Sequence, residues 1–184
     1  RTGIVVISAE TIKIGNQLCL LKHYQDITAR VNAQKSLKES EDRYREIFEK
    51  VSAGIFQTAK DGRILIANPA FAKMLGYNSA AELLSAAKNM KTSIYLNPEK
   101  RDELIDLISK YGSVSNYEVK VLKKNKEIIN VFINKHVVKN DAGEILYYEG
   151  TMEDITLQKR FSELKSAMNI AQLGYWEYDV ATGI

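Results

Sequence analysis

Apolar and polar residues alternate along several short stretches of this chain, a pattern typical of β-strands with one buried face. The alternation predicts strands over residues 54–58, 63–67, 114–123, 127–138 and 145–153. Between the second and third of these, apolar residues recur at helical spacing over 68–75, 80–86 and 98–110. Two strands, a helical crossing and three further strands predict an α+β domain, with the helices over one face of an antiparallel sheet.

Turn and capping residues mark where these elements begin and end. Asp61-Gly62 favours a tight turn between the first two strands, because glycine adopts positive φ without strain. Asn68 can cap the first free amides of the first helix, and Pro69 fits its first turn. Gly76 is expected to end that helix.

An internal repeat surrounds this domain. The tripeptide Asp-Ile-Thr occurs at residues 26–28 and again at 154–156, and Gly15 recurs as Gly143 at the same offset of 128 residues. Each glycine separates two apolar, alternating runs, which cover residues 4–7 and 18–24 in the first copy and 131–137 and 145–152 in the second. Each copy therefore predicts two strands joined by a polar turn.

The repeat predicts a tandem array in which one unit is whole. Its parts are the closing strands of a preceding unit (1–28), a linker helix (29–52), a complete domain (40–156), a second linker helix (157–172) and the start of a following unit (173–184). The following unit is inferred from Gly-Tyr-Trp at 174–176, which resembles Gly-Ile-Phe at 54–56. We expect the chain to be part of a longer protein.

The two partial units should each leave a sheet edge without a partner. Unpaired strand edges are commonly satisfied by adding another strand. We therefore expect a closing strand near residues 18–25 to pair with an opening strand near 174–180. Pairing between neighbouring chains is favoured over pairing within one chain, because the whole domain separates the two segments.

Charge and cysteine content narrow the class of protein. The net charge of +3 comes from 26 basic and 23 acidic residues spread along the chain, so neither nucleic acid nor an anionic membrane surface is predicted as a partner. The single cysteine, Cys19, excludes an intramolecular disulfide and fits a reducing compartment. No apolar run approaches the ~18 residues of a membrane helix, and the first residues do not resemble a signal peptide. These features predict a cytoplasmic segment without membrane contact.

Residues for catalysis or metal binding are scarce. The two histidines are His23, in the partial first unit, and His136, which alternation places on the face of its strand opposite Val131 and Ile133. No His pair, Cys cluster or carboxylate set has the spacing of metal ligands, and no glycine-rich phosphate loop occurs. We predict neither catalytic residues nor a metal site in this chain.

Six short motifs follow one another through the whole unit. They are Gly-Ile-Phe at 54–56, Asp-Gly-Arg-Ile at 61–64, Asn-Pro-Ala-Phe at 68–71 with Leu-Gly-Tyr at 75–77, Asp-Ala-Gly-Glu at 141–144 and Asp-Ile-Thr at 154–156. In this order and spacing they resemble the PAS (Per-Arnt-Sim) domain with its C-terminal PAC stretch. The resemblance implies a five-stranded antiparallel sheet in the order 2-1-5-4-3, with a cavity between the sheet and the helices. It also implies a place in a multi-PAS signalling protein, such as a sensor histidine kinase or a cyclic-dinucleotide enzyme.

The whole unit lacks the residues that bind cofactors in other members of this family. Flavin-binding, light-sensing members use a cysteine in an Asn-Cys-Arg-like motif, and residues 40–156 contain no cysteine. Haem-binding members take an iron ligand from a histidine of the long helix before the third strand, and residues 98–110 contain none. Haem and flavin are therefore both disfavoured, and the cofactor stays unassigned.

A candidate ligand pocket is formed by side chains that point from the sheet toward the helices, together with one helix residue. The resemblance assigns the first two strand positions, and alternation assigns the others. The set is Phe56, Thr58, Phe71, Tyr117, Val119, Val131, Ile133, Lys135, Tyr148, Gly150 and Met152. We expect Gly150 to leave room for a ligand, because it lacks a side chain. The alternative is that these residues fill the core among themselves.

Lys135 is the unusual member of this set, because it lies in phase with Val131 and Ile133. An inward lysine is costly unless it is paired or reaches an anion. Alternatively, Lys135 lies at the end of its strand and extends its ammonium group to water. From the sequence alone we favour the second interpretation.

The helices between units carry a second functional signal. Leu157, Phe161, Leu164, Met168 and Ala171 follow the spacing of a coiled-coil seam. A poorer version, broken by Ser40, consists of Ala33, Leu37, Tyr44, Ile47 and Val51. Such a stripe is more often core packing, but each one follows an Asp-Ile-Thr tripeptide and leads into the next unit. We therefore predict a homodimer seam at Leu157, Phe161, Leu164 and Met168, with signal relay through Asp154, Ile155 and Thr156.

Together these features predict a PAS sensory and relay segment of a multidomain signalling protein. It would bind a small ligand or partner and pass the change through coiled-coil linker helices. The alternative is a ligand-free dimerisation and spacer module with a filled core.

Overall fold

A computed structural model describes residues 3–15 and 17–170 of the 184-residue chain. The chain divides into two compact units, Arg1–Phe48 and Glu49–Ile184. The predicted start of a following unit at 173–184, and its pairing with the strand near 18–25, lie outside the described residues.

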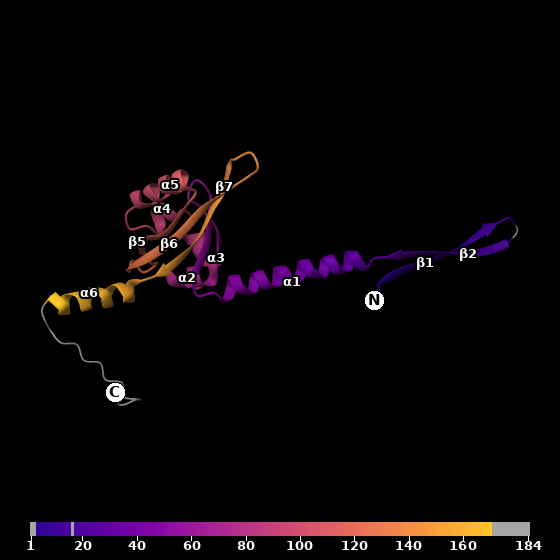
Figure 1. Ribbon diagram of the computed structural model, residues 1–184, viewed down its shortest axis with the longest axis horizontal. Helices are drawn as coiled ribbons and strands as arrows, with labels where there is room; N and C mark the ends of the chain where they lie inside the picture. Colours follow the sequence, from indigo (N-terminus) through magenta and orange to yellow (C-terminus); the bar gives the residue numbers. More distant parts are fainter. Residues whose placement is uncertain (1–2, 16, 171–184) are drawn as a thin grey trace, which may run out of the picture. The chain divides into compact units, whose positions relative to one another are not determined.

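The first unit is a β-hairpin followed by a helix. Strands β1 (Val5–Ile14) and β2 (Gln17–Asp26) pair antiparallel along their whole length, which confirms the two strands predicted for this segment (Figure 1). Gly15 takes a positive φ of 61° at the turn, where a side chain would be strained. Helix α1 (Thr28–Lys50) follows, and none of its residues is buried within the described chain.

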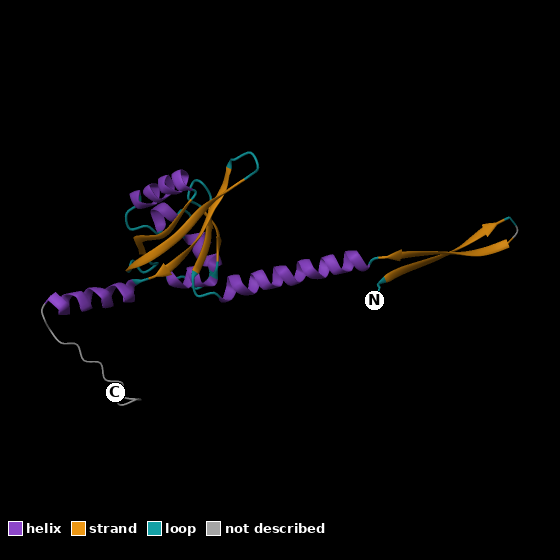
Figure 2. Ribbon diagram, viewed as in Figure 1, coloured by secondary structure: helices purple, strands orange, loops and turns teal. Residues whose placement is uncertain are grey.

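The second unit contains one five-stranded antiparallel sheet. Its strands are β3 (Gly54–Thr58), β4 (Ile64–Ala67), β5 (Ser113–Leu122), β6 (Ile128–Lys139) and β7 (Ile145–Asp154). Figure 2 shows strands in orange and helices in purple. The order of the strands across the sheet is β4-β3-β7-β6-β5. This order confirms the predicted 2-1-5-4-3 topology, in which the first and last strands of the domain are neighbours at the centre.

Short helices connect β4 to β5. They are α2 (Pro69–Met74), α3 (Ala80–Ala86), α4 (Met90–Ser93) and α5 (Glu99–Tyr111). Helix α2 contacts β3, α3 contacts β4, and α5 contacts β5 and β6. Three of these helices were predicted from apolar spacing, whereas α4, which is capped by the side chain of Asn89, was not. The last helix, α6 (Thr156–Ile170), leaves the end of β7.

Asn68 is a buried link between the first strand and the first helix. Its Oδ1 accepts hydrogen bonds from the backbone N–H groups of Ile55 (2.9 Å) and Phe71 (2.8 Å). Its Nδ2 donates to the carbonyl oxygen of Ala53 (3.0 Å). The predicted N-cap is therefore confirmed, and the same side chain also fixes where α2 sits on β3.

The hydrophobic core lies between one face of the sheet and the helices. Phe56 of β3 and Phe71 of α2 stack with ring centroids 4.8 Å apart, and both are fully buried. Leu104 and Ile108 present the apolar face of α5 to the same core. Each fully buried large apolar side chain of this kind stabilises the fold by about 1.5–3 kcal/mol.

The opposite face of the sheet carries polar side chains that contact one another across neighbouring strands. Gln57 donates a hydrogen bond to Glu149 (3.0 Å), and His136 Nε2 lies 2.9 Å from Glu149 Oε1. The His136 side chain is half exposed, which confirms its predicted place on the face opposite Ile133. His136 is therefore remote from the interior positions of its strand.

Candidate functional site

The side chains predicted to face the helices do turn inward. Nine of the eleven pocket candidates are buried: Phe56, Thr58, Phe71, Val119, Val131, Ile133, Lys135, Tyr148 and Met152. Tyr117 and Gly150 are partly exposed. Burial thus confirms the inward direction that the resemblance gave for Phe56 and Thr58 and that alternation gave for the other strand residues of this group. The role of these residues in ligand binding stays a prediction.

Tyr117 directs its polar end to α5. Its hydroxyl lies 3.2 Å from Glu103 Oε2, to which it donates, and 3.3 Å from the carbonyl oxygen of Lys100. Partial burial, followed by the hydrogen bond to Glu103, raises the pKa of the phenol. Tyr117 therefore closes the edge of the core between β5 and α5.

Gly150 has a different role from the one predicted. A Cβ atom at this position would lie 2.1 Å from the carbonyl oxygen of Asn134 and 3.0 Å from the Cα of Lys135. The space beside Gly150 is therefore filled by the backbone of the neighbouring strand β6 and is not open to a ligand. Glycine is needed there because β6 and β7 approach each other closely.

Lys135 lies in the core, so the favoured expectation that it reaches water is wrong. Only 2% of the residue is exposed, and β6 continues for four residues beyond it to Lys139, so Lys135 does not lie at the strand end. The ammonium group donates to Thr58 Oγ1 (3.1 Å). It also lies 5.5 Å from the ring centroid of Phe56 and 5.3 Å from that of Tyr148, within the range of cation–π attraction.

A second buried cation, Arg101 of α5, lies close enough to influence Lys135. Arg101 is 5% exposed, and its Nε and Nη2 are buried without a hydrogen-bond partner among the described residues. Burial, followed by the positive charge of Arg101, lowers the pKa of Lys135 from 10.5 to about 7. We call Lys135 and Arg101 the buried cation pair.

Tyr95 adds a polar group near Arg101. It follows α4, is almost fully buried, and its hydroxyl has no hydrogen-bond partner within the described chain. Burial raises the pKa of this phenol, while the charge of Arg101 acts in the opposite sense. The core thus holds two cations, a threonine hydroxyl and a phenol.

The sequence reasoning missed Arg101 and Tyr95. Arg101 is three and seven residues before Leu104 and Ile108, a spacing that places it on the buried face of α5. Tyr95 is five residues after Met90, in a short segment whose helix was not predicted. The signal for Arg101 was therefore available in the helical periodicity, whereas that for Tyr95 depended on recognising α4.

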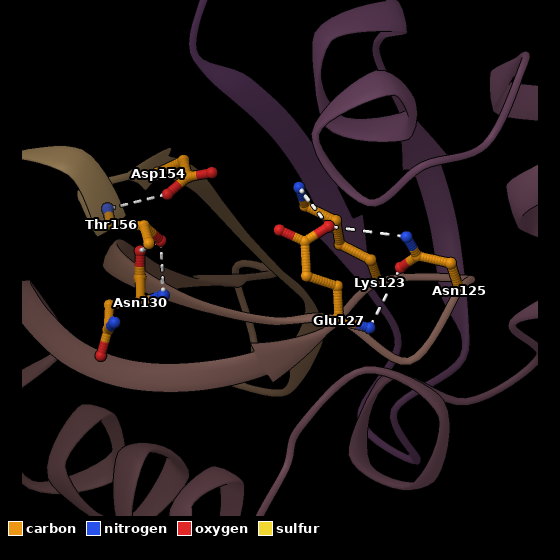
Figure 3. A network of polar contacts seen from close by, with 6 residues as sticks. All are labelled: Lys123, Asn125, Glu127, Asn130, Asp154 and Thr156. Atoms are coloured by element: carbon orange, nitrogen blue, oxygen red, sulfur yellow. Dashed lines mark hydrogen bonds and ion pairs between the residues drawn. The ribbon is translucent and has the colours of Figure 1, made fainter.

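The junction between β7 and α6 is held by a compact set of hydrogen bonds (Figure 3). Asp154 Oδ1 accepts from the Thr156 N–H (2.9 Å), and Thr156 Oγ1 accepts from the Asn130 N–H (2.9 Å). The Ile155 N–H donates to the Asn130 carbonyl oxygen (2.9 Å), and the Ile155 side chain is buried. We call these four residues the exit junction, because they fix where α6 leaves the sheet.

The first Asp-Ile-Thr tripeptide makes the same contacts. Asp26 Oδ1 accepts from the Thr28 N–H (2.8 Å), and Thr28 Oγ1 accepts from the Ile4 N–H (2.7 Å). The Ile27 N–H donates to the Ile4 carbonyl oxygen (2.9 Å). The sequence repeat is therefore also a structural repeat, with Ile4 in the place of Asn130.

An open surface groove of about 880 Å³ lies beside the exit junction. Its lining contains none of the predicted pocket residues, and it is open to solvent. The residues that line it are Glu49, Lys50, Ser52, Ala53, Pro69, Ala70, Lys73, Met74, Lys123, Glu153 and Asp154. Ligand sites bury most of the surface of their ligand, so this open groove is a weaker candidate than the buried cation pair.

Within residues 3–15 and 17–170, no group of three or more His, Cys, Asp or Glu side chains is arranged to hold a metal ion. No helix in the described part is long and apolar enough to cross a membrane.

The second unit is a small α+β module, with short helices over an antiparallel sheet and a helix leaving its last strand. Residues 52–157 match the family model described as the PAS domain, so the chain belongs to the PAS family. The crystal structure of a PAS domain from Colwellia psychrerythraea, 18% identical, superposes with a TM-score of 0.54 over 62% of this chain and 96% of that one. This similarity shows the shared fold.

Two curated relatives are multidomain signalling proteins. The chain is 29% identical over 153 residues to the sensor histidine kinase TmoS of Ectopseudomonas mendocina. The aligned region covers 80% of this chain and 15% of TmoS. It is 24% identical over 163 residues to the probable diguanylate cyclase DgcE of Escherichia coli, with 82% and 14% of the two chains covered. The chain therefore spans about one seventh of each relative and corresponds to a sensory signalling module within it.

Proposed function

We propose that this chain is a sensory and relay segment that binds a small ligand in the core of the second unit. Binding would change the position or dynamics of β7 and be passed to α6 through the exit junction. The relatives suggest a histidine kinase or a cyclic-dinucleotide enzyme as the output, located elsewhere in a longer protein. A cytoplasmic location of this segment belongs to the same proposal.

The observation that carries the proposal is the buried polar cluster beside the central strands. Lys135 pairs with Gly150 of β7 in the sheet register, and Thr58, which it contacts, pairs with Tyr148. A ligand that displaces Lys135 would therefore act directly on β7. Asp154 of the exit junction lies four residues after Gly150 on the same strand.

The repeated junction supports relay as the role of the helix that follows. The same set of hydrogen bonds holds the first turn of α1 and of α6, so each helix should move with the strand pair that it leaves. Relay of this kind is an equilibrium shift, limited by the difference in ligand affinity between two states.

The apolar seam of α6 supports self-association. Leu157, Phe161 and Leu164 are 78%, 58% and 58% exposed, and Met168 is partly exposed. Helix positions with coiled-coil spacing that expose large apolar side chains are expected to pack against another helix. A second copy of this chain, in a parallel pair of α6 helices, is the partner that we propose.

The test combines a ligand screen with hydrogen exchange. A library of charged and neutral metabolites is screened by thermal shift on the 184-residue chain, because binding at a hundredfold excess over Kd should stabilise it by about 2.7 kcal/mol. A compound that binds is then expected to change amide exchange in the first turns of α6. In Thr156→Val, which cannot accept the Asn130 N–H, that change should be reduced.

Two results would refute the proposal. If no metabolite raises the melting temperature, the filled-core spacer is the better description. If compounds bind but leave α6 exchange unchanged, the second unit binds ligands without relaying them through this helix. Ser115→Ala, an exposed change in β5, is the matched control for the effect of Thr156→Val.

A further inference from the structure

The buried charges of the second unit are all of one sign. Among the described residues, the buried polar or charged side chains are Thr58, Asn68, Arg101 and Lys135, so two cations are buried without a buried carboxylate. A charge removed from water is costly unless an opposite charge compensates it. The described residues therefore supply no buried negative charge to compensate these two cations.

The unpartnered atoms of Arg101 define the shape of the missing group. Nε and Nη2 lie along the same edge of the guanidinium plane, and both are buried without a partner. Their N–H bonds point in parallel, the geometry that accepts the two oxygens of a carboxylate in a bidentate pair. A ligand with a single acceptor atom would leave either Nε or Nη2 without a hydrogen-bond partner.

Neighbouring groups complete such a site. The Lys135 ammonium uses one of its donors on Thr58, and the Tyr95 hydroxyl has none of its hydrogen-bonding capacity used by the described residues. Gly62 of the β3–β4 turn lies against the guanidinium, since a Cβ there would be 3.1 Å from Nη2. The rings of Phe56 and Tyr148 supply an apolar wall beside Lys135.

We infer that the core ligand is a small organic carboxylate, bound in a bidentate pair by Arg101 with Lys135 as the second cation. This inference rests on the proposed function and names the class of its ligand. A carboxylate matches the site better than a phosphate, which has more oxygens and a larger charge than one guanidinium edge, one ammonium and one hydroxyl can satisfy. The rings of Phe56 and Tyr148, which lie beside Lys135, would contact the apolar part of the molecule.

The experiment compares carboxylates with their uncharged amides. Formate, acetate, butyrate and benzoate are titrated into the 184-residue chain beside formamide, acetamide, butyramide and benzamide. Sodium chloride and sodium phosphate at equal ionic strength complete the set. We expect a saturable rise in melting temperature with at least one carboxylate and none with its amide. A bound carboxylate should also raise the Lys135 pKa, followed by the ¹³Cε shift of that side chain.

Arg101→Met is the decisive variant. It should bind the responding carboxylate roughly ten- to hundredfold more weakly, because a bidentate charge-assisted pair is lost. Without ligand it should melt at or above the wild-type temperature, since a buried charge is replaced by an apolar side chain. Arg101→Lys keeps the charge without the paired edge and should bind with intermediate affinity. Arg45→Met, an exposed change in α1, should behave as wild type.

The outcomes separate this inference from the proposed function. The carboxylate assignment is overturned if amides bind as well as acids, if phosphate or chloride alone stabilises the chain, or if Arg101→Met binds normally. It is also overturned if Arg101→Met lowers the unliganded melting temperature and no carboxylate binds, because Arg101 then has a structural role only. If a neutral metabolite binds and alters amide exchange in α6, the proposed sensory function stands and the carboxylate inference fails. If a carboxylate binds without altering amide exchange in α6, the carboxylate inference stands and the proposed relay fails.

Discussion

Replacing Lys135 by methionine should remove most of the rise in stability that the wild-type chain shows between pH 7 and pH 9. Methionine has a similar length and no charge, so it can fill the same space in the core. The prediction follows from the environment of Lys135, in which burial comes first and the charge of Arg101 second in lowering its pKa to about 7. An unfolded chain should keep this lysine near 10.5.

The sign and size of the effect follow from proton linkage. Between these two pKa values the unfolded chain binds more protons at Lys135 than the native chain, so stability rises with pH. Each pKa unit is worth about 1.4 kcal/mol. The lowered pKa of Lys135 then reduces the free energy of unfolding by about 4 kcal/mol at pH 7 and by about 2 kcal/mol at pH 9. The free energy of unfolding should therefore rise by about 2 kcal/mol between these two pH values. Tyr95 acts in the opposite sense only above the ordinary pKa of tyrosine, near 10.

Urea unfolding at pH 7, 8 and 9 in buffers without carboxylates measures this difference directly. The wild-type chain and Lys139→Met, which removes an exposed lysine of the same strand, should both gain stability over this range. Lys135→Met should gain much less. The reasoning is refuted if Lys135→Met keeps the wild-type pH dependence, because Lys135 would then be protonated to the same extent in the folded and unfolded chains.

Three further substitutions test other parts of the structure. Asn68→Ala should lower the free energy of unfolding, measured in urea, by roughly 2–4 kcal/mol, because it leaves buried backbone N–H groups without an acceptor. A loss no larger than that caused by Asn125→Ala, an exposed change, would contradict this prediction. Gly150→Ala should cost roughly 2–4 kcal/mol, since its Cβ would lie 2.1 Å from the Asn134 carbonyl oxygen, and an unchanged urea midpoint would disprove the close approach. Phe161→Glu should weaken self-association in sedimentation velocity with little change in unfolding, whereas a monomeric wild-type chain at high concentration would rule out the seam.

Much of the second unit could be predicted because its signals are local. Strand alternation gives the inward direction of Val131 and Ile133. Asn68 followed by Pro69 marks the start of α2, because the Asn68 side chain caps the helix. The order of the strands is not local, and it came from the family resemblance. Helix α4 was missed because a helix of four residues has too little apolar periodicity to stand out.

The candidate site was predicted less well, because burial of a charge depends on distant parts of the chain. Alternation correctly placed Lys135 in phase with the core. Whether its ammonium reached water depended on Thr58 and on the rings that cover it, which lie far away in the sequence. Similarly, the approach of β6 that requires Gly150 to be glycine cannot be read from β7 alone.

The exit junction sets the rotational phase of every residue that follows it. Thr156 holds the first turn of α6 by a hydrogen bond to Asn130 of β6, and Thr28 holds that of α1 by a hydrogen bond to Ile4, the residue before β1. Each residue inserted after such a fixed point turns the rest of the helix by about 100°, and seven residues return it to within about 20° of its original direction. Linkers anchored in this way can change length by whole heptads and still present the same side to a partner, whereas a change of one or two residues turns that side away.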